Sequence, residues 1–416
     1  MSAILLPFDI IAYIIDTVGE NGDTNLLKEL ALVSRCFHQL CCKYLFATVD
    51  LSLSGSGTPW NPQIPSPKKR FVRLLESRPD VVKYIRELTY EVEWLNDPPL
   101  SLPSQSTEDY LLSPILPNIL RTITRLNCLT IDASNLSWNE INPCLTSAFL
   151  HLMHLPTINH IGLSLIRNFP MSSLYPSVNL LWLELSCMSF IDPLEKEIVV
   201  QSEMMPKLRE LHTPGSFELT MMLLHAKTQD GQLAFNIMNL RRFSSYFEDK
   251  WDLLYLLQNA KLLEILHLTV EEGESLEGLH EILSASPRTL NVLAFLAFVY
   301  ETSDGFFPQP LEGVCEGLEA LAGHNRLEDI IFEFKVSADY DETEGAIGSL
   351  IEDVKKLLAK PGWSALRRVF FKVLIFRSLV VKNAELLEAL RTLFDKHFSH
   401  SSKVGSVALN FSAYIV

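Results

Sequence analysis

A chain of 416 residues, 48% of them hydrophobic, exceeds what one compact core usually fills, so we expect two units or one elongated unit. The formal net charge of -15 at pH 7 argues against nonspecific nucleic-acid binding, which needs Lys and Arg side chains against phosphates. The 7 cysteines lack metal-type spacing, which favours reduced thiols and a cytoplasmic or nuclear protein. The first residues lack a secretory signal pattern. The longest apolar run is Leu290 to Tyr300, interrupted by Asn291, and it is too short to span a bilayer, so we expect no membrane association.

The first stretch of the chain predicts three short helices. Aliphatic residues recur at helical spacing after Pro7, and a loop is expected from Gly19 to Asp23. Thr24 or Asp23 can cap the second helix, and Ser34 can cap the third. The third helix carries a broad apolar stripe made of Phe37, Leu40, Cys41, Tyr44 and Leu45. Three helices of this length cannot bury all of that surface internally, so something else must cover the remainder.

These three helices resemble an F-box. The residues that carry the resemblance are Leu6-Pro7-Phe8-Asp9-Ile10-Ile11, Ile14-Ile15, Leu30 to Phe37, and Tyr44-Leu45-Phe46. Asp9 stands where the family usually has Glu, and Phe37 and Phe46 stand where it often has Trp. The resemblance implies that residues 1–50 form an F-box-like helical domain. The alternative is a helical cap that closes the end of a repeat array.

Residues 51–80 are expected to hold a linker and one helix. Ser, Gly and Pro dominate from Ser52 to Pro67, a composition typical of a linker or a loop. Further along, a proline-rich stretch from Asn96 to Asn118 predicts an inserted surface loop.

Residues 81–416 repeat one strand pattern of three aliphatic residues. Two residues separate the first from the second, and one residue separates the second from the third. Leu263-Leu266-Leu268 is the clearest copy, and the central positions of all copies are Leu88, Leu129, Ile161, Leu183, Leu211, Phe243, Leu266, Leu293, Ile330, Val369 and Val407. Their mean period is about 32 residues, with steps of roughly 22 to 41. Helical patterns lie between them, at Phe217–Ala226, Trp251–Asn259, Gly345–Leu358 and Ala384–Phe398.

This alternation predicts an α/β fold: an irregular leucine-rich-repeat solenoid of about eleven strand-helix units following the three helices. One unit cannot bury its aliphatic face alone, whereas stacked units bury a continuous one. The pattern resembles the degenerate leucine-rich repeats that often follow an F-box, notably in fungal proteins, although the Asn usual at the strand exit is missing from almost every copy. The alternative is an ordinary α/β domain with parallel strands and crossover helices.

No catalytic or metal-binding constellation stands out, so we expect no enzyme activity, no cofactor and no metal. His151, His154 and His160 lack an acidic or Cys partner at ligand spacing, and Leu350 occupies the place where a calcium loop starting at Asp339 would need Glu. Charge is the remaining signal: glutamates cluster from Glu271 to Glu281, and a basic tract holds Lys355, Lys356, Lys360, Arg367, Arg368, Lys372, Arg377 and Lys382. Such runs are either solvated faces or a polarised binding surface.

The resemblance implies the substrate-recognition subunit of an SCF-type ubiquitin ligase, in which a Skp-family adaptor links this chain to a cullin-RING complex. It implies adaptor binding through Leu6, Pro7, Ile10, Ile11, Ile14, Leu32, Val33, Ser34, Phe37 and Leu40. The expected concave side of the repeats offers contacts to an unknown protein substrate at Trp182, Glu184, Glu210, His212, Arg242, His267, Thr269, Glu333 and Lys372, unless these are simply solvated strand residues. The alternative function is a repeat-based interaction scaffold with no ligase role.

Overall fold

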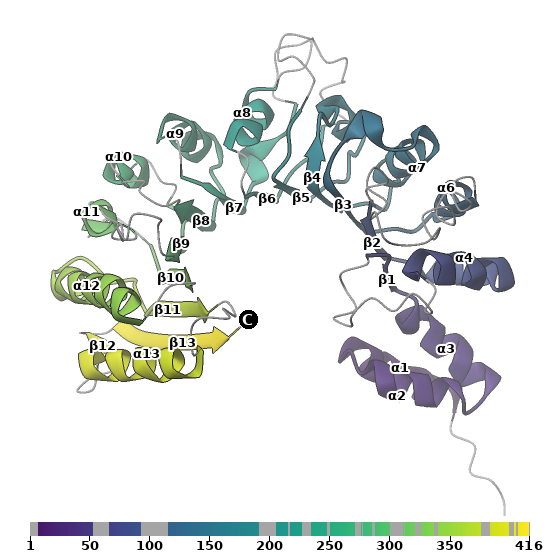
Figure 1. The fold of residues 1–416 in the computed structure, drawn as a ribbon, viewed down its shortest axis with the longest axis horizontal. Coiled ribbons are helices and arrows are strands. Elements are labelled where there is room, and N and C mark those ends of the chain that lie inside the picture. Colours follow the sequence, from purple (N-terminus) through teal and green to yellow (C-terminus); the bar gives the residue numbers. More distant parts are fainter. Residues whose placement is uncertain are drawn as a thin grey trace, which may run out of the picture. The chain divides into compact units, whose positions relative to one another are not determined.

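The chain forms two compact units, residues 1–206 and 207–416. A computed structural model describes residues 7–52, 66–92, 115–190, 205–214, 217–226, 234–247, 250–270, 276, 278–284, 288–299, 311, 313–319, 321, 326–336, 340–375, 383–398, 403–404 and 407–415. In both units parallel strands alternate with helices (Figure 1), which confirms the α/β fold class and is compatible with a solenoid-like repeat. The expected boundaries at residues 50 and 80 fall inside the first unit and stay a prediction.

The three expected helices open the first unit as α1 (Phe8–Glu20), α2 (Thr24–Ala31) and α3 (Arg35–Leu45). Pro7 precedes α1, where its missing N–H costs nothing. Asp23 caps α2 by accepting a hydrogen bond from the Leu26 N–H at 3.0 Å, and Ser34 caps α3 through the Phe37 N–H at 3.4 Å. The structure thus confirms Ser34 and selects Asp23 from the two candidates for the second helix.

The rest of the first unit is a parallel sheet in chain order with helices on one side (Figure 1). Its strands are β1 (Thr48–Asp50), β2 (Glu87–Glu91), β3 (Cys128–Ser137), β4 (His160–Arg167) and β5 (Trp182–Ser186). Its helices are α4 (Pro67–Ser77), η2 (Pro79–Tyr84), α6 (Ile115–Leu120), η3 (Trp138–Glu140), α7 (Pro143–Met153) and η4 (Met171–Leu174). The expected loop from Asn96 to Asn118 is wrong at its end, because α6 begins at Ile115 and buries Leu116 and Leu120.

The second unit follows the same plan until its last strand pair. Its strands are β6 (Glu210–Thr213), β7 (Arg242–Tyr246), β8 (Ile265–Val270), β9 (Val292–Val299), β10 (Asp329–Val336), β11 (Arg368–Ile375), β12 (Lys403–Val404) and β13 (Val407–Ile415). Its helices are α8 (Phe217–His225), η6 (Ile237–Asn239), α9 (Lys250–Asn259), α10 (Leu279–Ser284), α11 (Val314–Glu319), α12 (Tyr340–Ala359) and α13 (Asn383–Phe398). β13 pairs in parallel with β11, and β12 runs antiparallel to β13.

All eleven expected strand copies lie on strands, namely β2 to β11 and β13. Their central aliphatic residues are buried, because alternate strand residues point toward the helix-covered side. Two copies lack a third aliphatic residue, and there the buried positions are Thr213 on β6 and Ser245 on β7. The Thr213 hydroxyl lies 2.6 Å from the Thr220 hydroxyl on α8, which lies 3.3 Å from the Ser245 hydroxyl, so hydrogen bonding replaces the missing apolar contact.

One backbone contact recurs at successive strands. The carbonyl of the residue just before a strand accepts two N–H groups, from the residue before the next strand and from that strand's first residue. The Arg86 carbonyl, for example, accepts from Asn127 at 2.7 Å and from Cys128 at 3.0 Å. The same contact occurs at Ala47, Asn127, Asn159, Arg209, Arg241, Glu264, Asn291 and Glu328. A carbonyl oxygen has two lone pairs, so this shared acceptor joins neighbouring coils without any side chain.

Candidate protein-docking surfaces

Large apolar side chains are exposed on α1, on α2 and just after α2. Of the described residues, Phe8, Ile10, Tyr13, Ile14, Leu26, Leu32 and Val33 are exposed there, whereas only Ile115, Trp182, Met238, Leu262 and Tyr414 are comparably exposed elsewhere. Leu32 is 87% exposed, Tyr13 72% and Val33 65%. A group of exposed large apolar side chains close together along a chain often marks a contact with another molecule. We call these seven residues the exposed apolar set.

The ten residues expected to bind an adaptor fall into three groups. Ile10, Ile14, Leu32 and Val33 are exposed, as are Pro7 and Ser34, although the Ser34 hydroxyl already caps α3. Ile11, Phe37 and Leu40 instead pack against the buried core of the three helices. Leu6 lies outside the described residues.

Ile11, Phe37 and Leu40 are only half-buried, so they hold the helices together and still keep some exposed surface, and their contact with an adaptor stays a prediction. The helices are apolar on more than one face, so spacing alone does not tell the inner face from the outer one. Phe8, Tyr13 and Leu26 were missed as exposed residues. A usable signal existed for Tyr13, which stands three positions after Ile10 and therefore shares its side of α1.

A small core fixes the arrangement of the three helices. Ile15, Leu27 and Cys41, one from each helix, are buried together. At its edge one carboxylate oxygen of Asp16 meets the Lys43 ammonium at 2.5 Å and the Tyr44 hydroxyl at 3.1 Å. These contacts join α1 to α3, so the exposed apolar set sits on a defined support.

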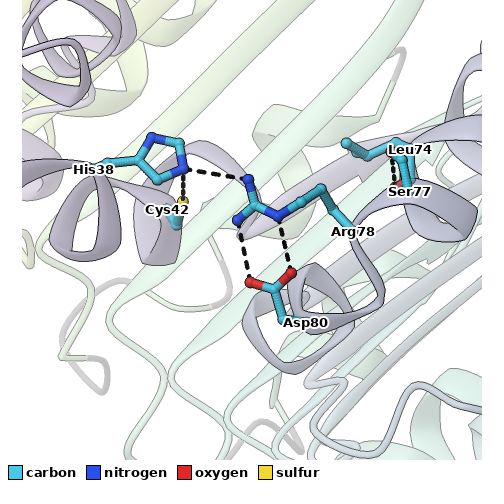
Figure 2. Close-up of polar contacts among 6 residues, drawn as sticks. All are labelled: His38, Cys42, Leu74, Ser77, Arg78 and Asp80. Atoms are coloured by element: carbon cyan, nitrogen blue, oxygen red, sulfur yellow. Dashed lines mark hydrogen bonds and ion pairs between the residues drawn. The ribbon is translucent and has the colours of Figure 1, made fainter. Parts of the chain in front are cut away.

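A polar network ties α3 to the segment after α4 (Figure 2). The His38 Nε2 atom lies 3.5 Å from the Cys42 thiol and 3.5 Å from Arg78 Nη1. Arg78 in turn donates to both carboxylate oxygens of Asp80, at 3.0 and 3.1 Å. Because a guanidinium can only donate, His38 Nε2 must be the acceptor, which places the proton of a neutral imidazole on Nδ1. The network supports α3 from the side of the strand repeats.

The uncovered side of the first sheet carries the first two candidate substrate contacts. We define the open face as the strand positions that point away from the helices. On it the indole of Trp182, which is 40% exposed, stacks on the His160 imidazole with ring centroids 4.2 Å apart and planes 6° apart. Glu184 follows two positions along β5. The Cys128 thiol lies 3.2 Å from His160 Nδ1, so three neighbouring strands contribute to one polar and aromatic cluster.

The other seven candidates lie on the second unit. Glu210, His212, Arg242, His267, Glu333 and Lys372 are exposed or half-buried on its open face. Arg242 lies 3.7 Å from Glu210 as an ion pair. Thr269 was expected to contact the substrate, but it is only 4% exposed. It lies between Tyr246 and Leu296 on the neighbouring strands and offers little surface to a partner.

His267 is the most perturbed titratable group of that open face. Burial is the main reason that its pKa falls to about 4, and His212, Lys335 and Lys372 lower the pKa further by charge repulsion. Its Nε2 atom has no hydrogen-bond partner among the described residues. His267 is therefore neutral at physiological pH.

The basic tract is largely neutralised within the chain. Each of its members from Lys355 to Arg368 forms an ion pair: Lys355 with Glu352, Lys356 with Asp353, Lys360 with Glu319, Arg367 with Glu328, and Arg368 with Asp329. Arg377 and Lys382, and the acidic run from Glu271 to Glu277 apart from Leu276, lie outside the described residues. The described part of the tract is thus better read as a solvated face than as a binding patch.

The histidine group considered as a metal site does not assemble. His151 is exposed, His154 bonds the Ser173 carbonyl at 2.8 Å, and His160 is stacked on Trp182. In the ranges that the structure describes, no three His, Cys, Asp or Glu side chains gather closely enough to hold a metal ion. No helix in the described part of the chain has both the length and the apolarity that crossing a bilayer requires.

Comparison of the sequence with known protein families and with curated proteins found no match.

Proposed function

We propose that this protein is the substrate-recognition subunit of an SCF-type ubiquitin ligase, with an F-box in its first three helices and degenerate leucine-rich repeats after them. A Skp-family adaptor covers the exposed apolar set and links the chain to a cullin-RING complex, which supplies ubiquitin transfer. The repeats hold a protein substrate near the conjugating enzyme and so raise its effective concentration. The chain itself contributes no catalytic residue.

The observation that carries the proposal is the exposed apolar set. Ile10 and Ile14 lie one turn apart on α1, and Leu32 and Val33 directly precede the cap of α3. These are positions at which the F-box resemblance places adaptor contacts. Fully burying a fully exposed side chain of this kind contributes about 1.5–3 kcal/mol, and because Ile10 and Ile14 are already partly covered, several members of the set must contribute to a stable complex.

The test is binding of a purified Skp-family adaptor to the full-length chain, measured by calorimetry. Pro7→Ala combined with Ile10→Asp should abolish binding, because it places a charge where an apolar side chain must be buried. Ile10 is exposed in the free chain, so thermal unfolding of the repeats should barely move.

A matched control is Leu262→Asp, since Leu262 is 43% exposed and Ile10 46%. It places the same charge on an equally exposed aliphatic position of the second unit and should leave adaptor binding unchanged. Failure of the folded wild-type chain to bind any Skp-family adaptor would instead favour a repeat-based scaffold whose first helices only cap the array.

A further inference from the structure

The open face of the first sheet is predominantly acidic from strand β1 to strand β5, with one Arg, Arg167, at the end of β4. Its positions follow from the register, in which Glu87, Cys128, His160 and Trp182 form one row across β2 to β5. The acidic residues on this face are Asp50, Glu87, Glu91, Asp132 and Glu184. Against them stands Arg167 at the end of β4, which alternates with the buried Ile166 and lies 3.7 Å from Glu140 as an ion pair. A partner on this face therefore meets a negative field.

Several of these carboxylates bind neutral donors rather than cations. Asp50 accepts from the backbone and the side chain of Ser52 at 2.9 and 2.7 Å, Glu87 accepts from the Thr48 hydroxyl at 2.9 Å, and Asp132 accepts from the Ser134 N–H at 2.8 Å. Burial is the main reason that the pKa of the Cys128 thiol is raised, while Glu87 and Glu184 raise that pKa further by charge. The negative charges of Glu87 and Glu184 thus both reach the Cys128 thiol, which lies between them on this face.

Trp182 supplies the aromatic part of the same face. One side of its indole rests on His160, which fixes the ring and lowers the entropy lost when a partner binds. Beside Glu184 in the next row is Gly162, where a Cβ atom would come within 3.3 Å of the Thr130 hydroxyl. The Thr130 side chain therefore covers Gly162, and Glu184 is the charged side chain of that row nearest to the fixed indole.

We infer that the open face of β1 to β5 binds a peptide segment of a partner protein that carries Arg or Lys side chains. Trp182 receives one cationic side chain against its ring, and Glu184 and Glu87 pair with that charge and with the next one along the segment. This inference deepens the proposed function because it gives the substrate a chemical class. It rests on the proposed function in one respect, namely that the bound segment is called a substrate.

The test uses the full-length chain and two fluorescent peptides of equal length, one alternating Arg with Ser and one alternating Glu with Ser. Fluorescence anisotropy should show binding of the Arg peptide alone, weakening as salt rises. Glu184→Lys should weaken binding by about tenfold or more, because it replaces an attraction with a repulsion. Trp182→Ala should weaken it by about threefold to tenfold, and Trp182→Phe by less, because a phenyl ring keeps part of the cation–π attraction.

The matched control is Glu76→Lys, which makes the same change in net charge at an exposed position of α4, on the helix side of the sheet. It should leave peptide affinity within about twofold. Equal weakening by Glu76→Lys would show mere attraction to net charge and overturn the inference, as would no Arg-peptide binding at low salt, or unchanged affinity in both Glu184→Lys and Trp182→Ala. Adaptor binding by the same preparations separates this outcome from a failure of the proposed function.

Discussion

Asp16 links α1 to α3 through a single carboxylate oxygen. The hydrogen bond from Lys43 is the main reason that the pKa of Asp16 is lowered; partial burial opposes this, and the Tyr44 hydroxyl adds to the lowering. A carboxylate with a lowered pKa stabilises the folded state at pH values above its unfolded pKa, near 4, and that stabilisation is lost as pH falls through the folded pKa. The support of the exposed apolar set is thus weaker in acid.

Asp16→Asn should therefore reduce the stability of the three helices at neutral pH but not in strong acid. Because Asp16 and Lys43 are each 40% exposed, solvent screening limits the expected loss to about 0.5 kcal/mol. Hydrogen exchange of α1 and α3 amides, measured from neutral pH down to about pH 2, checks this difference. A loss of equal size at every pH would mean that the carboxylate charge is not the cause, and Lys43→Gln should reproduce the neutral-pH loss.

The sequence could not show which apolar residues of the first three helices face the core and which face the solvent. Of the residues that the resemblance assigned to the adaptor, Ile10, Ile14, Leu32 and Val33 are exposed, and their contact with an adaptor stays a prediction. The resemblance also assigned Ile11 and Phe37 to the adaptor, although both pack on the core of the three helices. Only the packing of three helices against one another decides which apolar residue turns inward.

At the scale of elements, hydrogen bonding and apolar packing are interchangeable at the buried end of a strand. Thr213 and Ser245 occupy positions that hold leucine or phenylalanine in most other copies, and Thr220 bridges them from α8. The sequence showed these two copies as incomplete but did not show the reason, because the bridging hydroxyl comes from a separate helix.

Thr220→Val should destabilise the second unit by about 1–3 kcal/mol, since it removes the shared partner of two buried hydroxyls. The double variant Thr213→Val with Thr220→Val should recover part of that loss, because no buried hydroxyl of that pair is then left unpaired. Urea unfolding followed by circular dichroism measures both. A double variant that is less stable than Thr220→Val alone would contradict the proposed coupling.

On the scale of the whole molecule, strand order could be predicted and strand extent could not. Each copy of the repeat formed a strand, and within each unit the stacking of coils in chain order follows from the need of each to cover its neighbour. The three-residue strand β1 and the two-residue strand β12 were missed, since neither is long enough to show a pattern. The expected linker before Pro67 lies mostly outside the described residues.

In the second unit, a row of phenylalanines carries contact from coil to coil. Phe295, Phe332 and Phe371 are fully buried in register on β9, β10 and β11, with ring centroids 5.8 and 5.3 Å apart. Phe371 then contacts Phe394 of α13 at 6.2 Å, and Phe394 contacts Phe411 of β13 at 4.6 Å.

Phe332→Ala should therefore cost about 3–5 kcal/mol, and the damage should spread to the adjacent coils first. Hydrogen exchange should show the greatest loss of protection on β9, β10 and β11, decreasing toward β6. Phe332→Leu keeps most of the volume but loses the ring contacts, so it should cost about 1.5 kcal/mol, less than the alanine variant. A uniform loss of protection over the unit would contradict nearest-neighbour stacking.

The carbonyl that receives two N–H groups at each join has a consequence for how such a chain can vary. Since the join is made by main-chain atoms, it requires only that its two N–H donors are not proline, and it sets no number of residues between one join and the next. Steps as different as roughly 22 and 41 residues can follow one another in the same stack for this reason. Insertions in the helices and loops between joins can thus change what the protein binds while the parallel sheet stays the same.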